Sequence, residues 1–120
     1  MSTITKKQDI SRLFQQPTEE AVLLKQVKNF LEAQRDIKYM RINDRYVRGY
    51  ADVFACVNGW FCAFELKDDT GKPSQAQIDF LKDIHRSGGI GGICRSLGEV
   101  MYYVGQARCI SAGCKRKNKS

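Results

Sequence analysis

Apolar residues recur at three- and four-residue intervals between residues 17 and 32, which is the spacing of one face of an α-helix. The pattern is formed by Leu24, Val27, Phe30 and Leu31. Thr18 is a suitable N-cap, and acidic residues fill the first turn, where the helix dipole favours negative charge. Glu20 lies seven residues before Val27 and eleven before Leu31, so Glu20, rather than Glu19, lies on the apolar face. An acidic residue that faces a core is a candidate functional residue.

Three runs rich in β-branched and aromatic residues follow this helix. We predict strands over residues 37–42, 47–57 and 60–67, with a turn at 43–45. Asn58-Gly59 joins the last two runs, and this dipeptide favours a two-residue hairpin turn. The strands on either side of it should therefore be antiparallel neighbours. Gly49 permits a bulge or a close approach of another segment.

The next segments alternate between helix and strand. Ser74 is a suitable N-cap for a helix that buries residues such as Leu81 and ends near residues 87–89. Residues 90–96 then form an apolar strand, which should run parallel to the preceding one because a helix connects the two. Residues 97–105 pack on the sheet either as a strand or as the start of a short helix. These elements predict an α/β fold with a central mixed β-sheet flanked by helices.

The chain length of 120 residues fits one domain with a hydrophobic core. We assign residues 1–16 to an N-terminal arm, 17–108 to the domain and 109–120 to a basic C-terminal tail. Lysine and arginine outnumber aspartate and glutamate by 20 to 13, which gives a formal net charge of +7. Such an excess suits a polyanionic partner such as nucleic acid, although a basic surface can also serve solubility alone.

The sequence contains five cysteines and no Cys-x-x-Cys pair. We interpret all five as small buried apolar residues in a reducing compartment; they are Cys56, Cys62, Cys94, Cys109 and Cys114. A zinc site of Cys109, Cys114 and His85 is conceivable, but its spacing matches no common ligand pattern. Residues 1–16 lack the apolar core of a signal peptide, and no segment has the length of apolar sequence that crosses a bilayer. We therefore expect an intracellular, cytoplasmic protein.

Three charged residues interrupt the apolar hairpin, namely Asp52, Glu65 and Lys67. Counting from the Asn58-Gly59 turn places Asp52 opposite Glu65, and strand alternation puts Glu65 and Lys67 on one face. Charges in an apolar hairpin are costly to bury unless they pair or bind a cation. Two carboxylates and a backbone carbonyl, for which Leu66 is suitable, would hold Mg²⁺, and Lys67 would then orient the attacking water. The alternative is a solvated cross-strand ion pair.

Asp52 followed by Glu65-Leu66-Lys67 resembles the PD-(D/E)XK nuclease superfamily, and the wider frame resembles its virus-type replication-repair nuclease branch, the VRR-NUC domain. The resemblance covers about residues 17–104. The matching positions are Glu20, Asp52, Glu65, Lys67, Gln77 and Ser87-Gly88-Gly89, in that order. Ala51 stands where the family usually has a proline, a residue that shapes the strand and ligates nothing.

The resemblance implies roles for these residues. Glu20, Asp52 and Glu65 would be metal ligands or support them, Lys67 would position the nucleophilic water, and Gln77 would contact the site from the second helix. It also implies a DNA endonuclease that depends on Mg²⁺ or Mn²⁺. Stand-alone members of this branch resemble Holliday junction resolvases, which cut two symmetric strands. We therefore expect a phage-like homodimer that selects branched DNA, such as a four-way junction, in the cytoplasm of a host cell.

Two other functions are compatible with the sequence. One is a nucleic-acid-binding module that keeps the nuclease fold but hydrolyses nothing. The other is a sequence-specific restriction enzyme, which needs base-reading elements for which this chain is short.

Basic and aromatic residues near the predicted site are candidates for contacts with DNA. We predict phosphate contacts at Arg41, Arg45, Arg48 and Lys72. The arginines precede the Asp52 strand, and the alternative for them is the solvated face of a strand and turn. Tyr46 and Trp60 either stack on an unpaired base or pack within the hairpin. For His85, a surface or packing role is favoured over general base catalysis.

Overall fold

The computed structural model describes residues 18–43 and 49–114. Three helices are present in these ranges, namely α2 (Glu19–Glu32), α3 (Gln75–Arg86) and α4 (Leu97–Ser111). The strands are β1 (Ile37–Arg41), β2 (Val53–Val57), β3 (Trp60–Leu66) and β4 (Ile90–Cys94). None of the described helices is long and apolar enough to cross a membrane.

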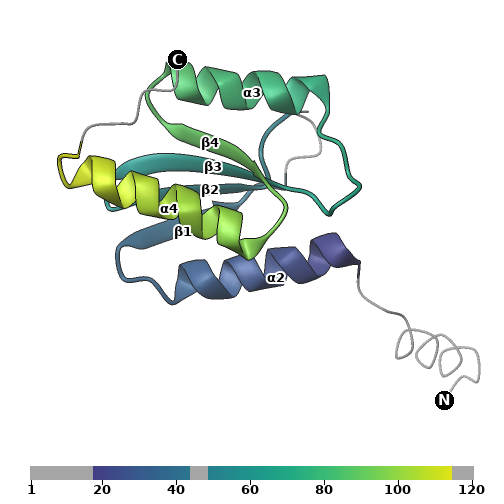
Figure 1. Cartoon of the computed structure of the whole chain (residues 1–120), viewed down its shortest axis with the longest axis horizontal. Coiled ribbons are helices and arrows are strands. Elements are labelled where there is room, and N and C mark those ends of the chain that lie inside the picture. The colour runs from purple at the N-terminus through teal and green to yellow at the C-terminus, as the bar shows by residue number, and fades with distance from the viewer. Residues whose placement is uncertain (1–17, 44–48, 115–120) are drawn as a thin grey trace, which may run out of the picture.

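The four strands form one mixed sheet in the order β1-β2-β3-β4. β1 and β3 each pair with β2 in antiparallel fashion, and β4 runs parallel to β3. Helices α2 and α4 pack on one face of the sheet, and α3 packs on the other face over β3 and β4 (Figure 1). The predicted α/β class, the mixed sheet and the parallel β3–β4 pair are therefore confirmed.

The Asn58-Gly59 turn sets the register of the central hairpin. Both residues have left-handed backbone angles, with φ of 49° and 88°, as a tight two-residue hairpin turn requires. Val57 pairs with Trp60 across the turn, and at the other end of the ladder Val53 pairs with Phe64. One step further along, Asp52 comes opposite Glu65, as the sequence predicted.

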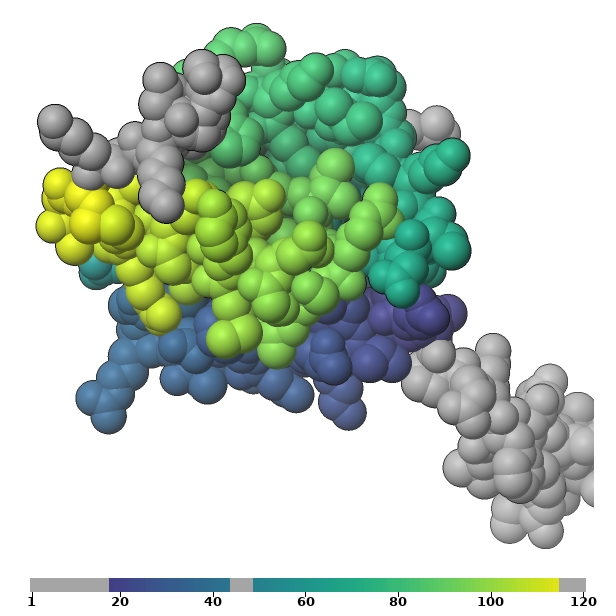
Figure 2. Space-filling model, viewed as in Figure 1, coloured from purple at the N-terminus to yellow at the C-terminus, as the bar shows by residue number. Residues whose placement is uncertain are grey.

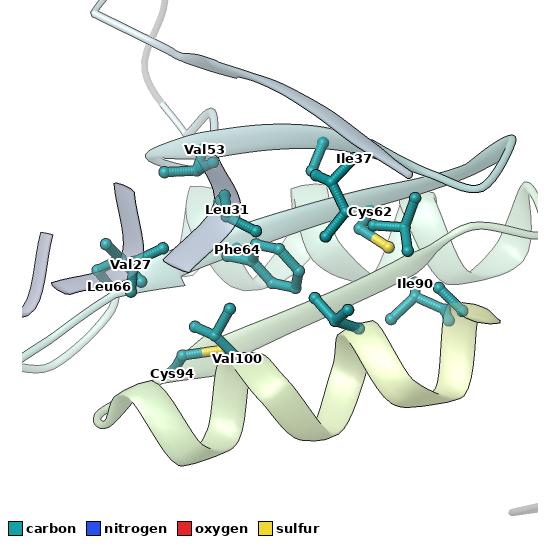
Figure 3. Close-up of a cluster of buried hydrophobic side chains, with 14 of the residues drawn as sticks. Val27, Leu31, Ile37, Val53, Cys62, Phe64, Leu66, Ile90, Cys94 and Val100 are labelled. Carbon is teal, nitrogen blue, oxygen red and sulfur yellow. The ribbon is translucent and has the colours of Figure 1, made fainter. Parts of the chain in front are cut away.

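The main core lies between the sheet and the pair of helices α2 and α4 (Figure 3). α2 contributes Leu23, Val27 and Leu31, which form a stripe at helical spacing. Phe64 of β3 is fully buried in this core and Val100 of α4 packs in the same cluster. Leu24, which the sequence placed on the inward stripe, is only partly buried, because the stripe is centred one position earlier.

A smaller core lies beneath α3 and contains Ala51, Ala63 and Leu81. α3 begins with the predicted N-cap, since Ser74 Oγ accepts the backbone N–H of Gln77 at 3.1 Å. Gln77 completes the capping box, because its side-chain oxygen accepts the backbone N–H of Ser74 at 2.9 Å. The start of α3 is thereby fixed at the edge of the sheet.

The prediction of a strand over residues 47–57 is wrong for residues 49–52, which lie outside β2. Here the chain turns toward α3: Gly49 has φ of +93°, and a Cβ at this glycine would come within 2.9 Å of Ala76 Cβ. The close approach expected for Gly49 is thus confirmed. Residues 47 and 48 lie outside the described residues.

Residues 97–111 form one long helix, which resolves the choice left open for residues 97–105. Ser96 caps this helix by accepting the backbone N–H of Glu99 at 3.3 Å. The helix continues through Ser111, beyond the predicted domain boundary at residue 108. Its apolar residues are spread around the helix, so the sequence lacks the one-sided pattern that identifies a surface helix.

Two cysteines are buried as expected. Burial raises the pKa of the Cys62 and Cys94 thiols to about 12. The prediction of burial is wrong for Cys56, which is exposed, and for Cys109 and Cys114, which are exposed and joined in a disulfide. The chain leaves α4 through Gly113, whose φ of +99° folds Cys114 back onto the helix end, where its N–H reaches the Cys109 carbonyl at 2.9 Å. This disulfide is incompatible with the zinc site considered above.

Candidate active site

Glu65 is a carboxylate inside the protein, since only 1% of it is exposed. One oxygen, Oε2, is held from two directions. Lys67 directly follows β3, and its Nζ lies 3.2 Å from this oxygen. Gln77 of α3 donates its side-chain amide to the same oxygen at 2.8 Å. The Lys67 side chain remains 18% exposed, so its ammonium group connects the buried carboxylate with the surface. The structure therefore brings together three of the predicted site residues.

The other oxygen of Glu65, Oε1, is buried and has no hydrogen-bond partner within the described residues. The pKa of the Glu65 carboxyl is raised to about 7, because burial and, to a smaller extent, the charge of Asp52 raise it by more than the contact with Lys67 lowers it. A buried acceptor without a donor costs free energy, because its hydration is lost and nothing replaces it. Such an atom is suited to contact a cation.

Asp52 lies immediately before β2 and reaches across to the end of β3. Its Oδ2 accepts the backbone N–H of Leu66 at 2.7 Å, which fixes the carboxylate beside the strand that carries Glu65. The influence of Asp52 on the pKa of Glu65 indicates that the two carboxylates share one electrostatic environment. The register predicted from the hairpin turn thus brings the two acids to the same end of the sheet.

Glu20 approaches this end of the sheet from the first turn of α2. A pocket of about 230 Å³ separates the helix from the strands; it is lined by Thr18, Glu20, Ala21, Leu24, Arg41, Asp52 and Leu66. Glu20 is half-buried there, whereas Glu19 is exposed. The charge of Glu20 also raises the pKa of Glu65, as the smallest of the contributions. Figure 2 shows the start of α2 and the segment after β3 at the same end of the molecule.

The carboxylates of Glu20, Asp52 and Glu65 and the Leu66 carbonyl are all oxygen ligands, which Mg²⁺ prefers. Mg²⁺ is commonly held by one or two carboxylates and several waters, and Asp52 and Glu65 are two carboxylates at this end of the sheet. Glu20 and the Leu66 carbonyl are further candidates. Over residues 18–43 and 49–114, no three His, Cys, Asp or Glu side chains are already gathered as a complete ligand set. The donor chemistry fits a hard divalent cation that keeps part of its water shell.

The predicted DNA-contacting residues are distributed around this site. Arg41 lines the pocket beside Glu20 and Asp52, and Lys72 is exposed in the loop that precedes α3. Arg45, Arg48 and Tyr46 fall outside the described residues.

Two further candidates make contacts within the fold. Trp60 is half-buried and packs against the main core, which favours the packing alternative over stacking on a base. A ring nitrogen of His85 lies 2.7 Å from the Gly91 carbonyl oxygen, whereas Gln77 and Lys67 contact Glu65.

The sequence did not reveal that Gln77 has two functions. Its side-chain oxygen caps α3 through Ser74, while its side-chain nitrogen holds Glu65. The spacing Ser-x-x-Gln before an apolar helix is a capping-box signal, so the first function was recognisable from the sequence. The second depends on where the helix start meets the sheet.

The structure thus combines a mixed sheet, helices on both of its faces, two acids at adjacent strand ends and a lysine two residues beyond one of these acids. Two solved structures share this fold with the chain. One, titled "VRR_NUC domain", is 20% identical with a TM-score of 0.63, and the match covers 74% of this chain and 97% of that one. The other, titled "VRR_NUC domain protein", is 15% identical with a TM-score of 0.60, covering 78% and 90%. No protein-family model and no curated protein matches the sequence. The chain therefore has the VRR-NUC fold.

Proposed function

We propose that this protein is a metal-dependent endonuclease that hydrolyses phosphodiester bonds in DNA. The observation that carries the proposal is the difference between the surroundings of the two Glu65 carboxylate oxygens. Lys67 and Gln77 contact one carboxylate oxygen, and the other is buried without a hydrogen-bond partner among the described residues. A carboxylate that serves only as half of an ion pair gains nothing from an orphaned second oxygen, whereas a metal ligand needs one.

Mg²⁺ or Mn²⁺ would be held by Asp52, Glu65 and the Leu66 carbonyl, with Glu20 as a ligand or as support for bound water. When bound, such a cation polarises the scissile phosphate and lowers the pKa of coordinated water. Lys67 has its ammonium group beside Glu65 and partly in solvent, where it can orient the attacking water and stabilise negative charge that develops on the phosphate. Gln77 keeps Glu65 aligned, and its amide carries no charge that would compete with the cation.

We propose branched DNA, such as a four-way junction, as the substrate and a homodimer as the active form. Both rest on the likeness to VRR-NUC domains described for the sequence, and the net charge of +7 suits a nucleic-acid partner. We propose that Arg41, which lines the same pocket as Asp52, and Lys72, which is exposed in the loop before α3, contact phosphates of the DNA. We assign the reaction to the cytoplasm, including that of a host cell if the gene is carried by a phage.

The second candidate is a nucleic-acid-binding module that keeps the fold and hydrolyses nothing. Two observations favour it: Lys67 and Glu65 form an ion pair at 3.2 Å, and the described part of the chain has no group of three metal-binding side chains. In this case the buried pair would be a structural element of the fold.

Cleavage assays distinguish the two candidates. Four-way junction, flap and linear duplex are incubated with Mg²⁺ or Mn²⁺ and with wild type, Lys67→Ala or Lys82→Ala. Lys82 is an exposed lysine on α3 and is the matched control. We expect junction cleavage that Lys67→Ala abolishes and Lys82→Ala leaves intact. Equal activity of Lys67→Ala, or no wild-type cleavage of any substrate, would overturn the hydrolytic proposal.

Two binding measurements complete the test. Calorimetry with Mn²⁺ should show uptake that Asp52→Asn abolishes, whereas a binding module need not take up metal. Sedimentation velocity with and without junction DNA measures whether the chain is a dimer, and a monomer in both conditions contradicts the homodimer.

A further inference from the structure

The loop between β3 and α3 connects the two elements that hold Glu65. Lys67 follows β3 directly, Gln77 lies in the first turn of α3, and both contact the same oxygen of Glu65. The path of residues 68–74 therefore sets how these two side chains meet on one carboxylate. A small shift of this loop would move Gln77 relative to Lys67, and hence the orientation of Glu65.

Arg95 clamps this loop from outside. Its Nη1 donates to the carbonyl oxygen of Asp68 at 2.5 Å and to that of Gly71 at 2.7 Å. A guanidinium Nη carries two hydrogens in a fixed plane, so one nitrogen can serve both carbonyls at once. The clamp thus joins the start and the middle of the loop.

Asp68 closes the same loop from inside. Its Oδ1 accepts the backbone N–H of Gly71 at 2.6 Å and that of Thr70 at 3.1 Å. A Cβ at Gly71 would come within 3.0 Å of this oxygen, so the turn is tight at that point. The loop therefore has one defined path, which is held from both sides.

Arg95 is itself fixed to the sheet and to α4. It follows Cys94, whose carbonyl accepts the backbone N–H of Lys67 at 3.1 Å. The N–H of Arg95 donates to Glu99 Oε1 at 2.5 Å, in the first turn of α4. The clamp therefore ties the loop to the part of the sheet that positions Lys67.

We infer that Arg95 is a positioning residue for the active site, which it serves by fixing the loop that sets the contact between Gln77 and Glu65. The kinetic part of this inference rests on the proposed nuclease function. Arg95 and its half-buried loop partners, Asp68 and Gly71, belong to neither hydrophobic core, so the loss of the Arg95 side chain leaves both cores packed. The effect should fall on the reaction rate rather than on the fold.

The kinetic test uses Arg95→Met, which keeps most of the side-chain length and removes the donors. Arg86→Met is the matched control, because Arg86 is an exposed arginine on α3 that forms an ion pair with the exposed Asp83. For Arg95→Met we expect kcat on junction DNA to fall about 10- to 100-fold. KM should stay within about 2-fold, because no substrate contact is removed. Arg95→Lys should recover part of kcat, and Arg86→Met should match wild type.

Two results overturn the inference. One is a folded Arg95→Met protein with wild-type kcat. The other is a change confined to KM, which would make Arg95 a substrate contact instead. If Arg95→Met does not fold, Asp68→Ala opens the same loop from its inner side and the same two criteria apply to it.

A second readout is independent of cleavage. The side-chain amide of Gln77 is followed by ¹⁵N NMR in metal-free wild type, Arg95→Met and Arg86→Met. We expect its resonances to move only in Arg95→Met, toward the shifts of an unbonded amide. Unchanged resonances overturn the inference even if wild type cleaves DNA, and moved resonances support it even if wild type cleaves nothing.

Discussion

Gln77 donates a hydrogen bond of 2.8 Å to Glu65 across the junction between α3 and the sheet, while its other side-chain atom caps its own helix. The two contacts can be separated by mutation. Gln77→Ala removes both, and Ser74→Ala removes only the hydroxyl half of the capping box. We expect each to lower the free energy of unfolding by about 1 kcal/mol.

Only Gln77→Ala should lower kcat, by about 10-fold or more, because only it releases Glu65. Urea unfolding and steady-state cleavage by the two variants measure both effects. Equal kcat values for the two variants would show that the contact between Gln77 and Glu65 has no part in the reaction.

The metal-free protein should lose stability as the pH rises from about 4.5 to about 7. Burial raises the pKa of Glu65 from 4.5 to about 7, so the folded state binds this proton more tightly than the unfolded state does. The contribution of the protonated Glu65 carboxyl to the free energy of unfolding is therefore fully present below its pKa in the unfolded chain. It is lost as the pH rises through its pKa in the folded protein. By the linkage relation it amounts to at most about 3 kcal/mol.

Glu65→Gln removes the titrating carboxyl group and keeps the size of the side chain. Urea unfolding with EDTA between pH 4 and pH 8, compared between wild type and Glu65→Gln, isolates the contribution of Glu65. The difference between the two proteins should change across this window, with wild type losing more stability. Parallel pH profiles would mean that Glu65 is not desolvated in solution.

Reduction of the Cys109–Cys114 disulfide should loosen the end of α4 without unfolding the domain. The bridge closes a short loop at the surface, and loop-closure entropy for such a loop gives about 2 kcal/mol. Hydrogen exchange with and without a reducing agent should show faster exchange near residues 109–114 only. Cleavage activity should be unchanged, because the bridge lies outside the candidate site. A loss of protection throughout the sheet would contradict this local role.

Gly92→Ala should destabilise the protein because a Cβ at this position would overlap the ring of Tyr103. Forced repacking of this kind costs about 1–3 kcal/mol. Gly105→Ala is the control, since a Cβ there meets no described residue within 4 Å and alanine favours a helix. Adding Tyr103→Ala to Gly92→Ala should reduce the penalty, which a double-mutant cycle measures. Additive effects of the two changes would indicate that the ring is not the obstacle.

Much of the fold follows from local signals in the sequence. Asn58-Gly59 fixed the hairpin and its register, and the Ser74 cap fixed the start of α3, because both signals act over only a few residues. α4 was ambiguous since its apolar residues surround the helix, so no single face identified its partner. The disulfide was missed because sequence spacing says nothing about the turn at Gly113 that brings the two sulfurs together.

The candidate site, too, was predicted from the sequence only in part. The sequence by itself determined that Asp52, Glu65 and Lys67 come to one end of a hairpin, because strand alternation and turn geometry fix relative positions along paired strands. Only the tertiary structure decided that Gln77 and Lys67 share one oxygen of Glu65, that the other oxygen has no hydrogen-bond partner in residues 18–43 and 49–114, and that Arg95 holds the loop between them. These contacts join segments far apart in the chain, and their geometry depends on how the helices pack on the sheet, which no local pattern specifies.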